Sequence, residues 1–573
     1  MLSRDRGVRL ISTFGPRSDE RIRDPAGLGI PSGRKNPGAT MSGPPMATPS
    51  VRMVARRSLL RRSAALGLVL AGGAGLASCG RQPVTTAGGP AGPPRRGGNL
   101  RVGMVGAGKN ESFNPAQATS ALINVAMCCA VFDCLLSITP SGRLRPMLAT
   151  SWSADAASET WTFQLRQGVR WHDGTEFTAD DVLYSLRWMA KPGNGMNANV
   201  AAVDLDHLKK TGPYTVTIPL KQAGPLFPYS LSMAWIIKNK TTDFTRPVGT
   251  GPFVFGSLAR GERSTCRRNP AYWDTGKPYV DQLTLYSLQD DTARLNALLA
   301  GEIDIMAQVP ATQARTQLYG DLRLIRSTGT SAQCFYMAVD RHPFNDVRVR
   351  QAMRLIVDRR QLVDVALLGY GSVANDLFGK GLPYFDGALP QRTRDIRRAK
   401  ELLAAAGHAT GLTLNLRTST VALGMVEAAT LFQQQAKKAN VTINVTQVDP
   451  TSYFDPTRDY LKMPFAQSFW QGFYTLGDFY SSSVVTGAVG DETHWANKHT
   501  DALVAAAIAA PDARAAQAAW ARVQAEQYDS GGYIWWGNID NIDAASNKVG
   551  GLVPGPYQNL GLPTGLTEAF LAS

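Results

Sequence analysis

A strand, a helix and a second strand follow one another directly between residues 412 and 448, and this order constrains the fold more than any other feature. Residues 412–417 and 441–448 alternate apolar and polar side chains, as half-buried strands do. Residues 421–439 between them show the apolar spacing of an amphipathic helix. We interpret the segment as a β-α-β unit, which places the chain in the α/β class.

The rest of the folded region mixes strands and helices in the same way, without an internal repeat. Thr178, followed by Asp180 and Asp181, is expected to cap a helix that ends near Trp188. At 573 residues the chain is too long for one ordinary core, so we expect two lobes. The further strands are predicted at residues 99–105, 161–166, 214–220, 253–258 and 282–288, and the further helices at residues 290–300, 346–358, 395–406 and 512–527.

The first 78 residues have the features of an export signal. They carry a net charge of +9 out of +15 for the whole chain, so the basic character does not indicate a nucleic-acid partner. Residues 1–50 show no periodicity and are expected to be disordered or an over-long start, since Met41, Met46 or Met53 could each initiate the chain. Residues 55–61, with Arg56-Arg57, precede a short apolar stretch at residues 64–77, in the order of a secretory signal. The paired arginines resemble a twin-arginine signal, and the general secretory route stays open.

The apolar stretch ends in Leu76-Ala77-Ser78-Cys79, which resembles a bacterial lipobox. We expect Cys79 to be lipidated and to become the first residue of a membrane-anchored protein outside the cytoplasm. The alternative is a plain cleaved signal. Residues 79–98 are rich in Gly, Pro and Arg and are interpreted as a flexible tether.

The five remaining cysteines are an odd number, which allows at most two disulfides and leaves one thiol free. They include a close group of three, but no Cys-x-x-Cys and no nearby histidine at zinc-ligand spacing. We therefore expect buried cysteines or one disulfide there, and no metal. The five are Cys128, Cys129, Cys134, Cys266 and Cys334.

No pattern in the sequence predicts catalysis. We find no Gly-x-Ser-x-Gly, no His-Glu-x-x-His, no phosphate-binding loop and no dinucleotide-binding loop, and the six histidines are scattered. The chain is accordingly expected to need no cofactor and not to be an enzyme.

A series of local motifs resembles family 5 of the solute-binding proteins, the dipeptide, oligopeptide and nickel binders of ABC importers. The resemblance spans roughly residues 99–570. The motifs are Met147-Leu-Ala-Thr-Ser-Trp152, Glu159-Thr-Trp-Thr-Phe-Gln-Leu-Arg-Gln-Gly-Val-Arg-Trp-His-Asp-Gly174, Phe177-Thr-Ala-Asp-Asp-Val182, Gly249-Thr-Gly-Pro-Phe253, Asn269-Pro-Ala-Tyr-Trp273, Leu298-Leu-Ala-Gly-Glu-Ile-Asp304, Phe344-Asn-Asp-Val-Arg-Val-Arg-Gln-Ala-Met353 and Asp358-Arg359.

Most of these residues are expected to have structural roles. Gly168, Gly174 and Gly251 lie where turns interrupt strands, and glycine tolerates a positive φ. His172 is interpreted as a turn or packing residue. The tryptophans of the motifs, Trp152, Trp161 and Trp273, are interpreted as core anchors.

The resemblance implies a two-lobed, periplasmic-binding-protein-like fold with two hinge crossings, near residues 327–336 and 537–545. It implies a first lobe at residues 99–336 with an inserted subdomain, a second lobe at 337–536 and a return to the first lobe at 537–573. Ligand would be trapped as the hinge closes. The implied function is that of a monomeric receptor that captures peptides or similar small amine-bearing solutes and delivers them to an ABC permease and its ATPase.

The residues assigned to the ligand site come from two segments. Phe469-Trp-Gln-Gly-Phe-Tyr-Thr-Leu-Gly-Asp478 resembles the family segment in which an aspartate pairs with the α-ammonium of a peptide, so Asp478 is the predicted anchor. Trp470, Phe473 and Tyr474 are expected to line the cleft, with core packing as the alternative. For Asp478 the alternative is a structural cap.

Weaker expectations concern two other stretches. Ser112–Ser120, with Asn114, resembles a ligand-facing loop of the first lobe. Gly371–Leu382 matches a stretch that carries an arginine for the ligand carboxylate in dipeptide binders, but here holds only Lys380. A sensory or chaperone protein on the same scaffold, or a hydrolase, remain as alternative functions.

Overall fold

The computed structural model describes residues 93–572, except for residues 319, 456–457, 556 and 558. The predicted export signal, the lipidation residue Cys79 and most of the predicted tether lie outside the described residues.

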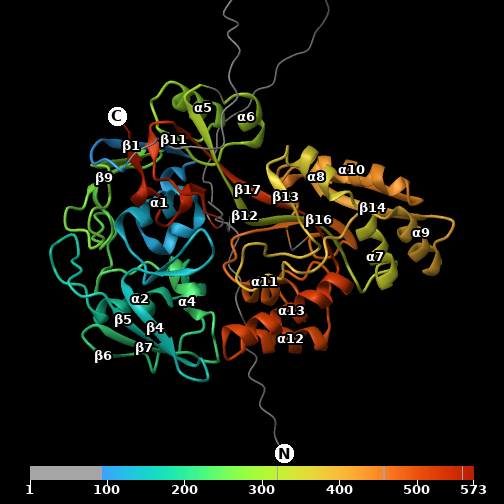
Figure 1. Ribbon diagram of the computed structural model, residues 1–573, viewed down its shortest axis with the longest axis horizontal. Helices are drawn as coiled ribbons and strands as arrows, with labels where there is room; N and C mark the ends of the chain where they lie inside the picture. Colours follow the sequence, from blue (N-terminus) through green and yellow to red (C-terminus); the bar gives the residue numbers. More distant parts are fainter. Residues whose placement is uncertain (1–92, 319, 456–457, 556, 558, 573) are drawn as a thin grey trace, which may run out of the picture. The chain divides into compact units, whose positions relative to one another are not determined.

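One mixed sheet of eleven strands runs through the described chain (Figure 1). Strands β12 and β17 are its longest members, and they pair antiparallel from Leu322↔Ser546 to Tyr336↔Tyr533. The order is β15 (Val441–Val448), β14 (Leu412–Ser419), β16 (Phe465–Trp470), β12 (Leu322–Met337), β17 (Tyr533–Ser546), β11 (Ile305–Met306), β1 (Asn99–Met104), β10 (Gln282–Ser287), β9 (Arg263–Arg268) and β8 (Phe253–Ala259), and β13 (Gly371–Val373) pairs with β17.

The predicted β-α-β unit is present in this sheet. Strands β14 and β15 are parallel, with Leu412 opposite Val441, and α10 (Met425–Lys437) packs on both of them. The apolar face of α10 contributes Phe432 to the core between helix and sheet.

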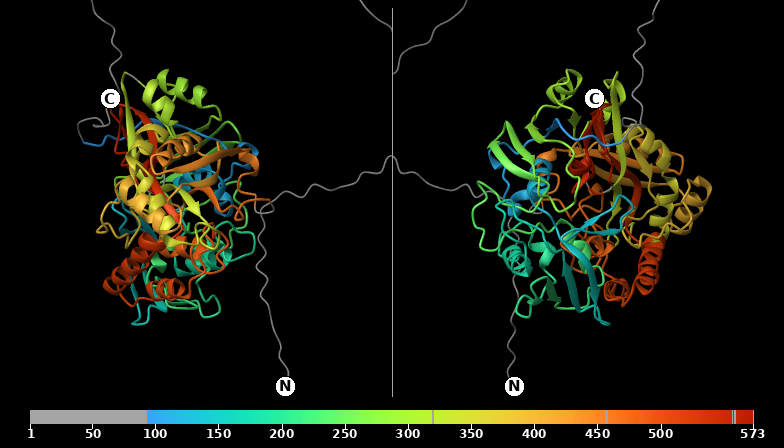
Figure 2. Two further views of the ribbon diagram at one scale, coloured as in Figure 1. Left: turned by 90° about the vertical axis from the view of Figure 1, so that its right-hand side faces the viewer. Right: turned by 60° about the vertical axis from the view of Figure 1, so that its left-hand side comes forward.

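Four hydrophobic cores divide the described chain into two groups. Two cores are built from residues 100–325 and 542–571, and we call this part the first lobe. The other two are built from residues 332–536, and we call this part the second lobe. Strands β12 and β17 pass between them, β12 after Ile325 and β17 after Trp536 (Figures 1 and 2). The fold therefore has two lobes joined by two crossings, while the predicted boundary residues stay a prediction.

The first lobe carries a separate antiparallel sheet of four strands, which corresponds to the expected subdomain. Helix α2 begins at a capping box, in which the Thr178 amide donates to Asp181 Oδ2 over 2.8 Å, as the sequence predicted. The sheet and its helix are β4 (Ala149–Ala154), β5 (Thr160–Leu165), β7 (Thr215–Pro219), β6 (Lys209–Gly212) and α2 (Ala179–Met189).

Helices and short strands complete both lobes (Figure 1). In the first lobe they are α1 (Leu122–Val131), β2 (Leu136–Ile138), β3 (Leu144–Pro146), α3 (Asn197–Val200), α4 (Phe227–Ser230), α5 (Asp291–Leu299), α6 (Ala311–Thr316), β18 (Val549–Gly550), α14 (Gly565–Glu568) and β19 (Phe570–Leu571). In the second lobe they are α7 (Val347–Ile356), α8 (Arg359–Ala366), α9 (Ile396–Ala405), α11 (Leu476–Ser483), α12 (Lys498–Ile508) and α13 (Ala513–Ser530).

Two of the motifs meet at one buried carboxylate in the first lobe. Asp133 accepts hydrogen bonds from Thr250 Oγ1 (3.0 Å), from the Tyr272 hydroxyl (3.0 Å) and from Trp273 Nε1 (2.8 Å). Burial raises the pKa of Asp133 to about 6 although these three donors lower it. The residue thus fastens the Gly-Thr-Gly-Pro segment and the Asn-Pro-Ala-Tyr-Trp segment to each other.

The expected positive φ is present at two of the three motif glycines and absent at the third. Gly168 and Gly174 have φ of +74° and +85°. Gly251 has no positive φ. Glycine is required there because the Cβ of any other residue would lie 2.6 Å from the Val131 backbone. His172 packs at the same place, where its Nδ1 accepts from the Gly249 amide and its Nε2 lies 3.0 Å from the Gly251 oxygen, so it is a packing residue as predicted.

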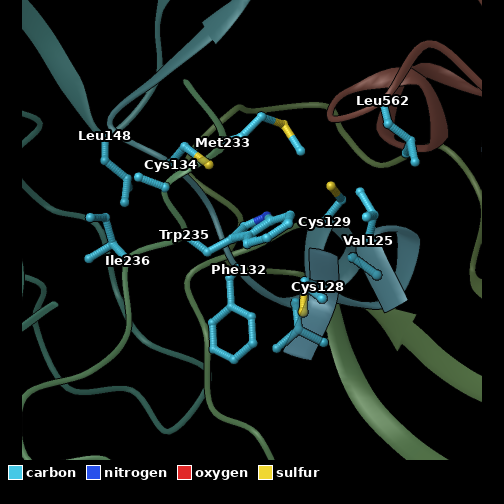
Figure 3. Packing of buried hydrophobic residues seen from close by; sticks show 14 of the residues in the cluster. Val125, Cys128, Cys129, Phe132, Cys134, Leu148, Met233, Trp235, Ile236 and Leu562 are labelled. Atoms are coloured by element: carbon cyan, nitrogen blue, oxygen red, sulfur yellow. The ribbon is translucent and has the colours of Figure 1, made fainter. Parts of the chain in front are cut away.

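The five cysteines of the described part are buried, unpaired thiols. Cys129 and Cys134 lie on either side of the Trp235 ring, and Cys128 lies near Phe132 (Figure 3). Of the two alternatives left by the sequence, the structure has the buried apolar cysteines.

Candidate ligand-binding site

Trp470, at the last position of β16, is held by a buried carboxylate. Its Nε1 donates to Glu492 Oε2 over 2.9 Å. Three hydroxyls also donate to Glu492, from Ser468 (2.5 Å), Tyr460 (3.0 Å) and Tyr533 (3.2 Å). Four donors from separate parts of the chain therefore fix one side chain, and through it the indole of Trp470.

Glu492 is electrostatically perturbed by its surroundings. Its side chain is fully buried, and this burial raises the pKa of Glu492 to about 7, even though the four hydrogen bonds lower it. A carboxyl group with such a pKa changes its charge close to neutral pH.

Trp470 and Phe473 belong to an aromatic cluster in the second lobe. The Trp470 ring centroid lies 5.8 Å from that of Phe473 and 5.6 Å from that of Phe479. Phe378 stacks on Phe479 at 4.2 Å and contacts Phe473 edge-on at 5.7 Å. Trp470 and Phe473 are only half-buried, so each packs on the core with one face and leaves part of its ring accessible.

Tyr474 lies where the two lobes meet. Its ring stacks on that of Tyr557, with the centroids 5.6 Å apart and an angle of 22° between the planes. Tyr557 belongs to the C-terminal segment of the first lobe, and its hydroxyl donates to the Gly381 oxygen of the second lobe over 3.3 Å. The structure thus places Tyr474 at the boundary between the lobes.

Asp478 is the third residue of α11 and forms a capping box with Thr475. The Thr475 amide donates to Asp478 Oδ2, and the Asp478 amide donates to Thr475 Oγ1, both over 3.1 Å. The residue is exposed, yet nearby chain removes water from its carboxylate and raises the pKa of Asp478, partly offset by hydrogen bonds from Thr475 and Tyr474.

The capping role that was one alternative for Asp478 is therefore real, whereas the ligand role stays a prediction. Both can coexist, since the capping box uses Oδ2 and leaves the residue accessible from solvent.

Asn114 caps the short helix Pro115–Ser120 in the first lobe, where its Oδ1 accepts from the Ala116 amide over 3.0 Å. Within the described part of the chain, no hydrogen bond or ring contact joins Asn114 to the four candidate residues of the second lobe. The structure thus brings together Trp470 and Phe473 and leaves Asn114 separate from them.

The stretch Gly371–Leu382 was compared with a segment that carries a carboxylate-binding arginine in dipeptide binders, and its charged residues have other roles. Lys380 Nζ donates to Ser372 Oγ over 3.1 Å. Asp376 is fully buried between Arg359 (2.5 Å) and Arg392 (2.6 Å). These arginines come from elsewhere in the second lobe, and both are engaged by Asp376, so they fix the stretch to its lobe.

Sequence reasoning missed Glu492 and Tyr557. Glu492 follows Asp491 in a polar loop, and its four donors lie up to 41 residues away, so no local spacing identifies it. Tyr557 lies in a Gly- and Pro-rich segment without periodicity. In the described residues no group of His, Cys, Asp or Glu side chains is placed to hold a metal ion. Nor does this part of the chain contain a helix with the length and apolarity needed to span a membrane.

Comparison with known proteins gives consistent results. Residues 143–491 match the family described as "Bacterial extracellular solute-binding proteins, family 5 Middle". The glutathione-binding protein GsiB of Escherichia coli K12 is 26% identical over 356 residues, which is 60% of this chain and 69% of GsiB.

Solved structures share the fold at lower sequence identity. HbpA2 from Haemophilus parasuis superimposes with a TM-score of 0.73 at 20% identity, covering 83% of this chain and all of that one. The oligopeptide-binding protein AppA from Bacillus subtilis, in complex with a nonapeptide, gives a TM-score of 0.61 at 21% identity, with coverage of 84% and 100%.

Proposed function

Because the chain belongs to family 5 of the bacterial extracellular solute-binding proteins, we propose that it captures peptides or similar small amine-bearing solutes between its two lobes and delivers them to the permease and ATPase of an ABC importer. Members of this family are binding components of transporters, so the chain is a binding protein and not an enzyme. The proposal includes the boundaries given above, with residues 337–536 as the second lobe. It also includes lipidation of Cys79, a location outside the cytoplasm on the membrane surface, and a monomeric state.

The position of Tyr474 is the observation that carries the ligand assignment. Tyr474 lies on the second lobe and contacts Tyr557 of the first, and it stands between Trp470 and Asp478 in sequence. An aromatic wall beside an exposed carboxylate suits a ligand with an ammonium group and apolar side chains. A ligand that contacts both lobes favours the closed arrangement, because only that arrangement satisfies both sets of contacts.

Asp478 is proposed as the anchor for the ammonium group. The raised pKa of its carboxyl indicates that water is partly excluded around it, and a charge-assisted hydrogen bond is stronger in such surroundings than on an open surface.

Native mass spectrometry of gently purified protein tests the proposed function, since it identifies solutes that co-purify. Reduced glutathione, which GsiB binds according to its name, and a set of di- to pentapeptides are then titrated by calorimetry. Binding of at least one peptide with a stoichiometry of one, and its recovery unchanged after hours, is the expected result. Conversion of the bound solute, or absence of any bound peptide or small amine in both measurements, would contradict the proposal.

A further inference from the structure

Two cavities adjoin each other in the first lobe, and neither lining includes Trp470 or Asp478. The first has a volume of about 310 Å³, and apolar side chains form much of its lining: Ile138, Pro140, Tyr279, Val553, Tyr557 and Leu562. The second has a volume of about 260 Å³, and Arg145, Arg166, Trp273 and Asp274 are among its lining residues. Arg145, Thr564 and Glu568 belong to both linings and form their common boundary.

The two acidic groups that line the second cavity, Asp274 and Glu568, are both engaged by a lysine. Lys277 Nζ lies 2.7 Å from Glu568 Oε1 and 3.1 Å from Asp274 Oδ2. One lysine therefore engages both carboxylates, and their charges are largely satisfied within the lobe.

The two arginines have no comparable partner. Arg145 donates through Nε to Ser137 Oγ (3.1 Å), and its nearest carboxylate oxygen, on Glu568, is 3.8 Å away, beyond hydrogen-bond distance. Arg166 donates to the Met147 oxygen (3.0 Å), and its guanidinium lies 4.3 Å from the centre of the Trp273 ring. In the described part of the chain neither guanidinium has a carboxylate within hydrogen-bond distance. Together with Lys277, the two arginines outnumber the carboxylates Asp274 and Glu568 at the second cavity.

The walls of the cavities are fixed by the core. Trp273 is held by Asp133 through its Nε1 (2.8 Å), and Tyr279 packs edge-on against Phe570 with the ring centroids 6.1 Å apart. A preformed cavity with apolar walls and a few convergent polar groups is the usual form of a small-molecule site, and 310 Å³ is within the range of such sites.

We propose that these cavities form a second binding site, distinct from the cleft between the lobes, for a small amphipathic anion. Its carboxylate or phosphate group pairs with Arg145 and Arg166 in the second cavity. Guanidinium groups suit these anions because they offer parallel N–H donors at the spacing of two acceptor oxygens. The apolar part of the ligand occupies the first cavity. Tyr557 lines that cavity and stacks on Tyr474, so the site is linked to the contact between the lobes.

Calorimetry on the whole mature protein tests the site with four named probes. Octanoate and octyl phosphate supply the two anionic head groups, inorganic phosphate lacks the apolar part, and octylammonium reverses the charge. We expect octanoate or octyl phosphate to bind, the stronger one identifying the head group, and the other two to bind at least tenfold more weakly. Equal binding of octylammonium, or no binding of either octyl anion, would overturn the proposal.

Four variants locate the binding. Arg145→Gln should weaken the preferred octyl anion at least tenfold, whereas Arg143→Gln, an exposed arginine of the same hairpin outside both linings, should leave it unchanged. Val553→Trp fills the first cavity from an exposed position and should also weaken binding. Asp478→Asn, which alters the proposed cleft site, should leave the affinity for the octyl anion unchanged. If Asp478→Asn abolishes binding and Arg145→Gln does not, the octyl anion occupies the cleft and the second site does not exist.

Discussion

Tyr474 of the second lobe stacks on Tyr557 of the first, with ring centroids 5.6 Å apart and 22° between the planes. Tyr474 lies just before α11, and Tyr557 lies in the C-terminal segment. The Tyr557 hydroxyl also donates a hydrogen bond to the Gly381 oxygen. Aromatic pairs of this kind contribute about 0.5–1.5 kcal/mol beyond their buried area. A free energy of this size is enough to shift an equilibrium between arrangements of the lobes.

Tyr557→Ala should change the affinity for the cleft ligand about two- to tenfold, because it removes the stack and alters the free energy of lobe closure. Tyr557→Phe keeps the ring and removes only the hydrogen bond to Gly381, so its affinity should remain near the wild-type value. Calorimetry with the peptide found by co-purification measures both. Equal affinities for wild type and Tyr557→Ala would show that the stack does not contribute to closure.

Glu492 should make stability depend on pH near neutrality. Its pKa is about 7 in the folded protein against 4.5 as the ordinary value, so the folded state holds the proton more tightly. The resulting stabilisation is complete below pH 4.5 and is lost as the pH rises through 7. At about 1.4 kcal/mol per pKa unit, the wild type should lose up to about 3 kcal/mol between pH 5 and pH 8 from this group.

Glu492→Gln isolates that contribution, because an amide does not titrate. Asp133 and Asp543, whose pKa values are raised to about 6, act in the same direction but are common to both proteins. Urea unfolding at pH 5 and pH 8 gives the stability difference between wild type and variant. Between pH 5 and pH 8 the variant should gain stability relative to the wild type. A difference in the free energy of unfolding that does not depend on pH would contradict the prediction.

The contact between Glu492 and Trp470 can also be tested through ligand affinity. Since Glu492 orients the Trp470 indole, Glu492→Gln should alter the affinity for the cleft ligand, whereas Glu526→Gln, which removes a carboxylate that bonds Thr500 in the same lobe, should not. If Glu492→Gln folds and binds as the wild type does, the orientation of Trp470 has no part in ligand recognition.

Several helices were predicted from segments in which one face is apolar and the other polar, although α8, which has such a face, was missed. Residues 395–406 were expected to form a helix, and α9 covers Ile396–Ala405 with Ala399, Leu402 and Leu403 inward. Helix α1 was missed because nine of its ten residues are buried, so it lacks the amphipathic period by which helices are recognised.

The candidate site was less predictable than the fold. Trp470 and Phe473 could be proposed from one continuous motif, and they are neighbours in the structure. Glu492 and Tyr557 reach the site from other segments, so no local pattern around Trp470 identifies them. Asp478 shows the limit of local reasoning, because the same Thr-x-x-Asp pattern suits a helix cap and a ligand anchor.

The lipid anchor can be tested independently of the fold. Cys79→Ala should release the protein from membranes, because it removes the proposed site of acylation, and acyl chains supply about 0.8 kcal/mol of anchoring per buried CH₂ group. Fractionation of cells after a high-salt wash, with immunodetection of the protein, measures the distribution. Retention of the Cys79→Ala protein in the membrane fraction would exclude this residue as the anchor.

Asp478→Asn separates the two roles of that residue. As an anchor it faces an ammonium in the closed cleft, and loss of the charge should cost about 2–5 kcal/mol of binding free energy. Affinity should then fall at least tenfold, since each 1.4 kcal/mol corresponds to about one decade. For the wild type, affinity should weaken on acidification, because protonation removes the same charge, and the raised pKa of Asp478 moves this loss to higher pH than for an ordinary carboxyl.

Asp181→Asn is the matched control, because Asp181 occupies the same capping-box position in α2 of the first lobe. Asparagine offers the same capping oxygen as aspartate, so neither variant should lose more than the roughly 0.5–2 kcal/mol of stability that a cap contributes. Asp181→Asn should leave affinity unchanged, whereas Asp478→Asn should lower it, because only at Asp478 does an ammonium lose its counter-charge. Calorimetry and urea unfolding on both variants decide the matter: if Asp478→Asn lowers stability and binds as tightly as wild type, Asp478 is a helix cap alone.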